Sequence, residues 1–217
     1  MRTILILTPK GGCGKSTLAT NIAGHFAALG KRVALADCDP QGSSRDWLAV
    51  RPGHLAPITC VAAKDGSLII DPQTEVLVMD SPAGIHDQRL VNIIRPAQTL
   101  VIPVLPSPID LRAAEHFLAE LVKLRNRLKR KVKIATVANR VREDTVIAAR
   151  LEQYLEKLTL PGGNRIPFMT MLRASQNYIL AAARGMTIFE LPHYKTAYDR
   201  EQWRPLLSWL ASDRSIA

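Results

Sequence analysis

The chain alternates between short apolar runs and stretches with helical periodicity from one end to the other. β-branched and other apolar residues form runs of strand length at residues 3–8, 33–37, 75–80, 99–104 and 132–139. Apolar positions recur at helical spacing at 16–30, 87–94, 111–128, 145–158 and 177–184. Continuous apolar strands separated by helices are typical of a parallel sheet covered on both faces. The pattern therefore predicts an α/β fold, with residues 1–217 forming one domain around a mostly parallel, twisted sheet.

Bulk composition narrows the class of protein. Apolar residues make up 47% of the chain and charged residues 22%, which is ordinary for a globular protein and argues against disorder. No apolar run reaches the roughly 18 residues that a membrane-spanning helix needs. The cysteines Cys13, Cys38 and Cys60 lack the spacing of a metal site and are expected to be reduced thiols. The segment 52–72, rich in Pro and Gly, is predicted to be a connection with room for one short strand.

A glycine-rich turn, Lys10-Gly11-Gly12-Cys13-Gly14-Lys15-Ser16-Thr17, joins the first predicted strand to the first predicted helix. This is the context that a phosphate-binding loop requires. Glycines let the backbone curl so that its N–H groups point at phosphate oxygens, and the helix start adds its positive dipole end. Lys15 is expected to reach the β and γ phosphates, and Ser16 to ligate Mg²⁺. The sequence predicts a P-loop NTPase domain whose nucleotide contacts are Gly11, Gly12, Cys13, Gly14, Lys15, Ser16 and Thr17.

The loop departs from the common form GxxxxGK[ST], because Pro9 occupies the first glycine position and Lys10 follows it. In this respect it resembles the deviant Walker A ATPases of the ParA and MinD type, and most closely the short plasmid-partition ParA proteins. The resemblance covers essentially the whole chain. It implies ATP and Mg²⁺ as cofactors, and it implies that Lys10 reaches across a nucleotide-sandwich homodimer to the partner subunit's phosphates. A cation supplied in trans accelerates other NTPases by roughly 10³–10⁵.

Two aspartates follow predicted strands in the chain order that this family uses. Asp39 lies in Asp37-Cys38-Asp39-Pro40-Gln41-Gly42, which resembles the DxDPQG segment of ParA proteins. The resemblance implies that Asp39 positions the attacking water and supports Mg²⁺, while Asp37 acts through hydrogen bonds behind it. Asp80 ends an apolar run, as a Walker B aspartate does, and is expected to hold Mg²⁺ through water. The predicted catalytic residues are Lys10, Lys15 and Asp39, and the predicted metal ligands are Ser16, Asp39 and Asp80.

Two features are candidates for adenine recognition. Asn139-Arg140 closes a predicted strand and resembles the Asn-Arg pair of MinD-like proteins, whose asparagine reads the base. An asparagine amide both donates and accepts, as the edge of adenine requires, although a strand-ending turn explains Asn139 nearly as well. Residues 103–111 resemble the proline-rich loop of small ParA proteins, which packs near the base and the dimer interface. Pro106 is the candidate contact in this loop.

The net charge of +10, from 29 Lys and Arg residues against 19 Asp and Glu residues, exceeds what a nucleotide pocket needs. Seven cations fall between 123 and 133 without an acidic residue. Such a run is usually a solvated helix end, but this one is long enough to indicate a polyanionic partner. The family resemblance implies non-specific DNA binding by the ATP-bound dimer. The predicted DNA-binding residues are Arg127, Lys129, Arg130, Lys131, Arg142, Arg173 and Arg184.

The resemblance also implies a biological role. Proteins of this type are weak ATPases whose hydrolysis is stimulated by a small partition or adaptor protein. They segregate or position a plasmid, a chromosome region or a protein cargo such as a carboxysome, and the expected location is therefore cytoplasmic and nucleoid-associated. Because the first predicted strand begins at residue 3, no N-terminal helix-turn-helix domain is expected. The identity of the cargo lies in the partner and not in this chain.

Two alternatives stay open at this point. A MinD-like membrane-associated ATPase needs a C-terminal amphipathic helix, and helical spacing is shared by Trp203, Leu206, Leu207 and Leu210. Pro205 and Asp213 favour instead a final helix docked on the core, so a membrane is not the expected partner. The other alternative is an ATP-dependent biosynthetic synthetase of the same superfamily. Lys10 weighs against it, because those relatives generally lack the signature lysine.

Overall fold

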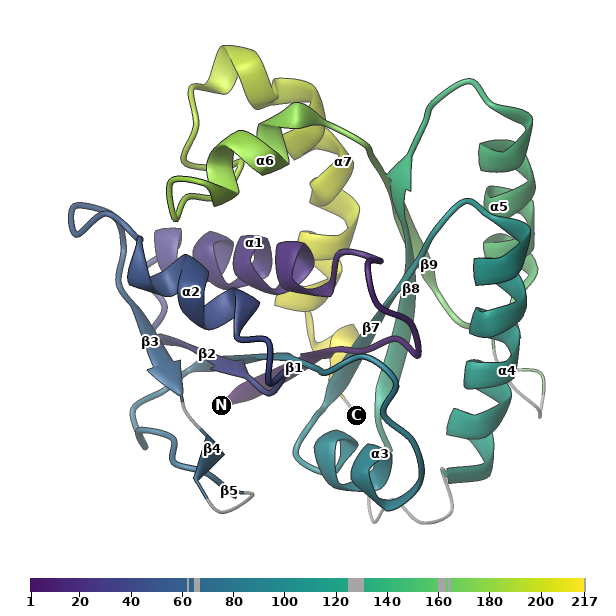
Figure 1. Cartoon of the computed structure of the whole chain (residues 1–217), viewed down its shortest axis with the longest axis horizontal. Helices are drawn as coiled ribbons and strands as arrows, with labels where there is room; N and C mark the ends of the chain where they lie inside the picture. The colour runs from purple at the N-terminus through teal and green to yellow at the C-terminus, as the bar shows by residue number, and fades with distance from the viewer. Residues whose placement is uncertain (62, 65–66, 125–130, 160–162, 164, 217) are drawn as a thin grey trace.

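A computed structural model shows one sheet of seven parallel strands, in the order β3-β2-β6-β1-β7-β8-β9, with helices on both faces (Figure 1). It describes residues 1–61, 63–64, 67–124, 131–159, 163 and 165–216. Every pairing in this sheet is parallel, and β4 and β5 form a small antiparallel pair beside it. The predicted α/β class is confirmed, and the sheet is wholly rather than mostly parallel.

The elements follow one another in an alternating order along the chain. The strands are β1 (Arg2–Ile6), β2 (Val33–Asp37), β3 (Ile58–Val61), β4 (Ala63–Lys64), β5 (Ser67–Leu68), β6 (Val76–Asp80), β7 (Thr99–Val104), β8 (Lys133–Val141) and β9 (Phe168–Arg173). The helices are α1 (Lys15–Ala28), α2 (Ser43–Ala49), α3 (Asp87–Ile94), α4 (Pro108–Leu124), α5 (Val146–Lys157), α6 (Gln176–Ala182) and α7 (His193–Ala211), followed by the 3₁₀ turn η2 (Asp213–Ser215).

The central strands are buried on both faces, and successive side chains enter two separate apolar cores. Leu5 and Leu7 pack into the core covered by α3, α4 and α5, whereas Ile4 and Ile6 pack into the core covered by α1, α2 and α7. This division follows from the two-residue period of a strand. Because β1 lies between β6 and β7 in the middle of the sheet, the loop that follows β1 is held from both sides.

Strand β9 is an element that the hydrophobic pattern does not reveal. Its sequence mixes polar and apolar residues, and only Leu172 among them is fully buried. It forms one edge of the sheet, and α7 closes that edge. The Thr170 hydroxyl donates to the Gln202 carbonyl at 2.5 Å, and the Arg173 N–H donates to the Gln202 side chain at 3.0 Å. Tertiary contacts with α7 therefore complete a strand whose own sequence is only weakly apolar.

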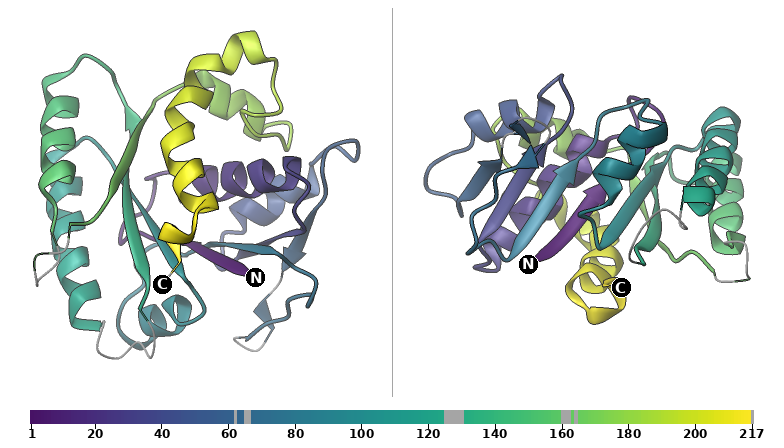
Figure 2. Two further views of the ribbon diagram at one scale, coloured as in Figure 1. Left: turned by 180° about the vertical axis from the view of Figure 1, so that it is seen from behind. Right: turned by 90° about the horizontal axis from the view of Figure 1, so that it is seen from below.

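Helix α7 docks its apolar face against the sheet, as the C-terminal pattern predicts. Its spaced apolar side chains, Trp203, Leu206, Leu207 and Leu210, are between 0% and 6% exposed. Viewed from behind, the helix descends beside β9 and ends close to the N-terminus (Figure 2). The Arg2 guanidinium fixes this end by donating to the Ser212 carbonyl at 3.0 Å and to the Ser215 hydroxyl at 2.6 Å. No helix in the described part of the chain is long and apolar enough to cross a membrane.

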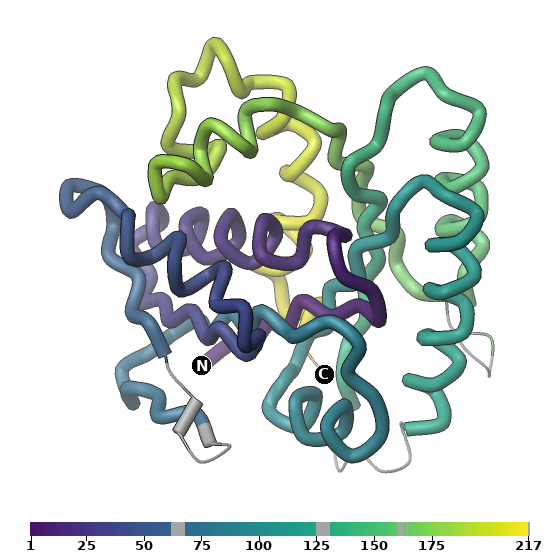
Figure 3. The backbone as a smooth tube through the Cα atoms, in the orientation of Figure 1, coloured from purple at the N-terminus to yellow at the C-terminus, as the bar shows by residue number. Residues whose placement is uncertain are grey.

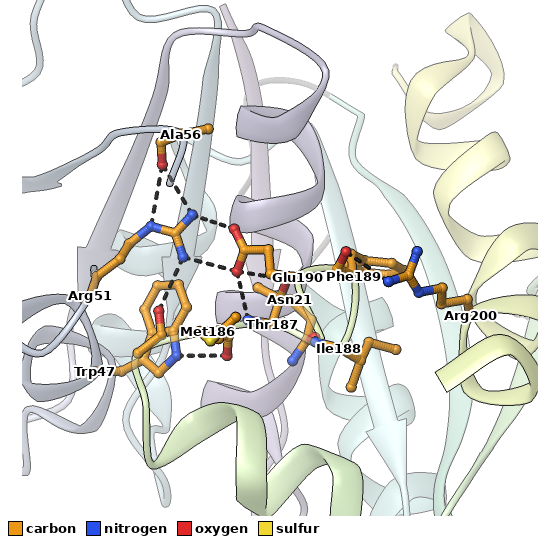
Figure 4. A network of polar contacts seen from close by, with 11 residues as sticks. Asn21, Trp47, Arg51, Ala56, Met186, Thr187, Ile188, Phe189, Glu190 and Arg200 are labelled. Atoms are coloured by element: carbon orange, nitrogen blue, oxygen red, sulfur yellow. Dashed lines mark hydrogen bonds and ion pairs between the residues drawn. The ribbon is translucent and has the colours of Figure 1, made fainter. Parts of the chain in front are cut away.

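A buried polar network joins α2 to the loop between α6 and α7 (Figure 4). The side chains of Arg51 and Glu190 form an ion pair at 2.5 Å and are only 6% and 8% exposed. Arg51 also donates to the Ala56 carbonyl at 3.0 Å, and Glu190 accepts from the backbone N–H of Thr187 at 2.7 Å. The Trp47 indole donates to the Met186 carbonyl at 3.2 Å. These contacts hold α2, the helix that follows the Asp39 loop, in a fixed place.

Candidate nucleotide site

The phosphate loop lies at the carboxyl end of β1, and Figure 3 traces the chain through it into α1. Gly12 and Gly14 have φ values of +76° and +87°, which residues other than glycine rarely adopt. A Cβ on Gly14 would also lie 2.4 Å from the amide nitrogen of Asn139, so both backbone conformation and space require glycine there. No side chain caps α1, and its first turn carries no acidic residue. The leading N–H groups of α1 therefore remain available to an anion.

The two lysines of the loop occupy different environments. Lys15 is 7% exposed, and its ammonium donates to the Lys10 carbonyl at 3.2 Å, inside the curl of the loop. The Lys10 side chain is 37% exposed and forms an ion pair with Asp110 at 3.1 Å. Ser107 donates its hydroxyl to the other oxygen of Asp110 and so orients this carboxylate. Lys15 thus faces inward toward a phosphate position, whereas Lys10 lies on the rim.

Asp80 provides a buried carboxylate directly beside the loop. Its register partner on β1 is Ile6, and the residue is 1% exposed. One carboxylate oxygen accepts from the Ser44 hydroxyl at 2.6 Å, while Oδ1 has no hydrogen-bond partner among the described residues. Burial raises the pKa of Asp80 above its ordinary value, and the hydroxyls of Ser16 and Ser44 partly oppose this shift. An unpaired, buried carboxylate oxygen next to a P-loop serine suits Mg²⁺, which binds oxygen ligands and phosphates.

Asp37 and Asp39 organise the turn that follows β2. Asp37 accepts the backbone N–H of Asp39 at 3.0 Å and that of Arg45 at 2.9 Å, so it shapes the turn and holds the first turn of α2. Asp39 accepts the Gln41 N–H at 3.0 Å and is partly exposed. Asp37 pairs with Asp80 in the sheet, which places this turn at the same edge as the phosphate loop. The catalytic and metal roles predicted for Asp39 stay predictions.

A β-bulge in β8 turns two consecutive residues toward the phosphate loop. Ala138 and Val141 pair with Met171 and Arg173, so β8 carries one extra residue between these pairs. The Asn139 amide donates to the Cys13 carbonyl at 2.7 Å, and the Arg140 guanidinium donates to the Gly12 carbonyl at 3.0 Å. Arg140 has a φ of +54°, which lets both side chains reach the same loop.

The two adenine candidates both lie beside the phosphate loop. Asn139 is 5% exposed and its NH₂ group is already engaged with the loop, so its clearest role is to support the loop from behind. Pro106 follows β7 at the same edge of the sheet and precedes the Ser107–Asp110 contact. The contact of either residue with a base stays a prediction.

The predicted DNA-binding residues that the structure describes, Lys131, Arg142, Arg173 and Arg184, lie in different surroundings. Arg142 and Arg184 are exposed, whereas Arg173 donates to the buried carboxylate of Asp199 at 2.7 Å and stacks on a tyrosine ring. Lys131 precedes β8 and Arg142 follows it, so roughly 30 Å of strand separates them. Arg127, Lys129 and Arg130 lie outside the described residues.

Three contacts of the site escape sequence reasoning, although Arg140 was noted beside Asn139. Ser44 reaches Asp80 from α2, Asp110 reaches Lys10 from α4, and Arg140 reaches the phosphate loop from β8. Each of them is distant in the chain from the residue that it contacts, and each belongs to a common residue type without a distinctive spacing. For Asp110 a signal does exist, since it lies within the proline-rich loop 103–111. For Arg140 the signal is the neighbouring Asn139.

The fold and site together define a P-loop nucleotide-binding domain, and comparison with known proteins gives its family. The sequence profile of the CobQ/CobB/MinD/ParA nucleotide binding domain matches residues 4–188. The chain belongs to this family. It is accordingly a ParA/MinD-like ATPase, and the resemblance inferred from Lys10 and the loop around it is confirmed at the level of the family.

Relatives cover nearly the whole chain. Maintenance of carboxysome distribution protein A is 28% identical over 195 residues in Halothiobacillus neapolitanus, covering 87% of both chains. Its counterpart in Gloeobacter kilaueensis is 30% identical over 194 residues, covering 87% of this chain and 84% of the relative. The chromosome-partitioning ATPase Soj of Thermus thermophilus is 26% identical over 239 residues, covering 95% and 94%.

Solved structures show the same fold at low sequence identity. The apo McdA structure from Cyanothece has a TM-score of 0.73 at 15% identity, covering 98% of this chain and all of the other. MinD in the MinC:MinD complex of Aquifex aeolicus has a TM-score of 0.69 at 18% identity, covering 97% and 94%. These likenesses extend across the sheet and both helical layers, which confirms the fold.

Proposed function

We propose that this chain is a ParA-type positioning ATPase. ATP and Mg²⁺ favour a sandwich homodimer, the dimer binds DNA without sequence preference, and a partner protein stimulates hydrolysis and releases it. Cycles of this kind distribute a plasmid, a chromosome region or a protein cargo. The carboxysome-distribution and chromosome-partitioning relatives support a positioning role.

The observation that carries this proposal is the contrast between the two loop lysines. Lys15 is enclosed and suits the phosphates of its own subunit, whereas Lys10 lies on the rim and suits those of a second subunit. The ion pair between Lys10 and Asp110 is partly exposed. Such pairs contribute only about 0–1 kcal/mol, so the phosphates of a facing nucleotide can displace it.

Hydrolysis would depend on the carboxylates beside the phosphate loop, at the carboxyl ends of the strands. Mg²⁺, when bound with ATP, neutralises charge on the phosphates, and Ser16 and Asp80 would hold it. Asp39 would orient the attacking water, while Asp37 and the network around Arg51 keep the turn and α2 in place. Hydrolysis by the isolated protein is expected to be slow, because the partner supplies the stimulating contact.

DNA binding is assigned first to two exposed arginines, Arg142 after β8 and Arg184 after α6. Arg142 and Arg184 are exposed and have no ion-pair partner among the described residues. Arg173 already has a carboxylate partner, so its contribution is expected to be small. Contacts to phosphates position a protein without reading bases, which fits binding that is independent of DNA sequence.

Electrophoretic mobility shift on an arbitrary DNA duplex tests the proposed function. We expect binding with ATP but not with ADP, and an affinity that falls as salt rises. Replacing Arg142 and Arg184 with alanine should weaken binding and lower the salt slope by about 1 for each phosphate that is no longer neutralised. Arg150→Ala, at an exposed site on α5, is the matched control and should change neither quantity.

Other outcomes would contradict this function or support a different one. DNA binding that ignores the nucleotide would contradict the switch. ATP-dependent sedimentation with anionic vesicles, without DNA binding, would support a MinD-like membrane protein instead. A new product formed from ATP, glutamine and a small carboxylic acid would support a synthetase.

A further inference from the structure

A groove lies at the amino ends of β7, β8 and β9. The phosphate loop lies at the other, carboxyl ends of the strands. The volume of the groove is about 600 Å³. The ends of α3, α4 and α7 border it through Ile94, Leu121 and Trp209. The groove shares no lining residue with the nucleotide site.

The rim of the groove is basic. Lys131, Lys133, Arg165 and Arg214 line it and are all exposed, and no aspartate or glutamate is among its described lining residues. None of the four forms an ion pair with a carboxylate in the described part of the chain. Asp213, which precedes Arg214, acts electrostatically on Arg2 instead. Arg165 donates to the Glu156 carbonyl at 2.5 Å, so the four cations of the rim have no carboxylate partner among the described residues.

The floor of the groove is apolar. Ile166 and Trp209 are almost fully buried, at 3% and 7% exposed, while Ile134 and Met169 are partly exposed. At the start of β8, exposed Lys133 alternates with the less exposed Ile134, as the two-residue period of a strand dictates. Consecutive side chains leave opposite faces of the sheet, but at this strand end both Lys133 and Ile134 line the groove.

We propose that this groove binds an acidic segment of a partner protein, in which carboxylates alternate with apolar side chains. Such a segment satisfies both features at once, since its carboxylates meet the cationic rim and its apolar side chains cover the floor. A DNA backbone presents phosphates and sugars but no apolar side chains for the floor. The inference goes beyond the proposed function, because this site is separate from the nucleotide site and needs no nucleotide.

Fluorescence anisotropy with a short labelled peptide of alternating Glu and Leu tests this proposal on the full chain. We expect saturable binding that weakens with salt. Lys133→Glu combined with Arg214→Glu should weaken it roughly tenfold or more, because attraction becomes repulsion. Arg150→Glu removes the same kind of exposed charge far from the groove and should leave the affinity unchanged. A peptide of alternating Glu and Ser should bind much more weakly than the Glu-Leu peptide.

Three results would overturn the proposal: no peptide binding, equal binding of the Glu-Ser peptide, or binding that survives the charge reversal. Binding of duplex DNA or phosphatidylglycerol vesicles that the reversal abolishes, with the peptide unbound, would also overturn it. Unchanged ATP affinity shows that the charge-reversed variant is folded. If that variant does not fold, Lys133→Gln combined with Arg214→Gln is tested instead. If the wild-type chain binds DNA with ATP but does not bind the peptide, the groove proposal fails and the proposed function stands.

Discussion

At the scale of single residues, the site depends on where each lysine of the phosphate loop is held. Lys15 opens α1 and points back into the loop, where its ammonium donates to the Lys10 carbonyl. Asn139 and Arg140 brace the same loop through its carbonyl groups. Because those carbonyls are engaged from outside, the N–H groups of the loop are free to face the ligand.

Replacement of Lys15 with alanine should reduce ATP affinity by roughly 100-fold, which corresponds to the removal of a strong charge-assisted hydrogen bond. Isothermal titration with ATP measures it. Lys31→Ala is the matched control, because Lys31 is an exposed lysine paired with Glu75 on the opposite edge of the sheet. Equal affinity in both variants would contradict the site assignment.

The ionised carboxylate of Asp80 costs stability in the folded protein, and a bound cation would reduce this cost. Burial raises the pKa of Asp80, so the folded chain disfavours the ionised form. Stability therefore falls as pH rises from the ordinary carboxyl pKa to the raised one, and the penalty is complete above it.

Asp80→Asn should raise the thermal midpoint of the nucleotide-free protein at neutral pH, because asparagine has no charge to bury. The same variant should lose the additional stabilisation that Mg²⁺ adds to ATP. Differential scanning fluorimetry with ATP, with and without Mg²⁺, measures both effects. A lower midpoint without nucleotide, or an unchanged Mg²⁺ effect, would contradict the role assigned to Asp80.

At the scale of elements, α2 and the α6–α7 loop are locked together by a buried ion pair. Arg51 and Glu190 are each almost fully enclosed, and Gly185 permits this approach. A Cβ on Gly185 would lie 2.5 Å from the Arg51 backbone, and its φ of +62° favours glycine as well. This ion pair holds the end of α2 in place, and Asp37 holds the start of the same helix.

Glu190→Ala should lower the free energy of unfolding by about 3–5 kcal/mol, because it leaves the Arg51 charge buried without a partner. Arg51→Met combined with Glu190→Leu should recover most of this loss. Glu201→Ala breaks an exposed pair with Arg204 and should cost about 0–1 kcal/mol. Denaturant unfolding measures all three, and equal losses for Glu190→Ala and Glu201→Ala would contradict the buried lock.

Elements with a strong local signal were predictable, and those built by tertiary contact were not. The apolar strands and the amphipathic helices follow from periodicity, and the docked C-terminal helix follows from the spacing of Trp203 and its neighbours. Strand β9 was not predictable from its own sequence, because Gln202 on α7 supplies two of its polar partners. In the site, the phosphate loop was predictable because its residues are contiguous in the sequence. The bulge that brings Arg140 to Gly12 depends on an extra residue whose effect only strand pairing reveals.

At the scale of the whole molecule, the phosphate loop and the basic groove lie at opposite ends of the strands of the sheet. Strand ends with aspartates and the phosphate loop gather at the carboxyl edge, as ligands of open α/β sheets do. Four cations without a carboxylate partner among the described residues lie with apolar residues at the amino ends of β7, β8 and β9. The described cations are therefore not gathered on one surface, and the net charge of +10 does not by itself locate the residues proposed to bind DNA.

The most direct test of the account is the mass of Asp39→Ala with ATP and Mg²⁺, measured by light scattering after size exclusion. Without hydrolysis the ATP-bound dimer should persist, so we expect twice the 23.9 kDa mass of the chain. Adding Lys10→Ala should return the protein to the monomer while it still binds ATP, because alanine cannot reach the phosphates of the facing subunit. An Asp39→Ala protein that binds ATP and stays monomeric, or a dimer that ignores Lys10, would contradict the shared site.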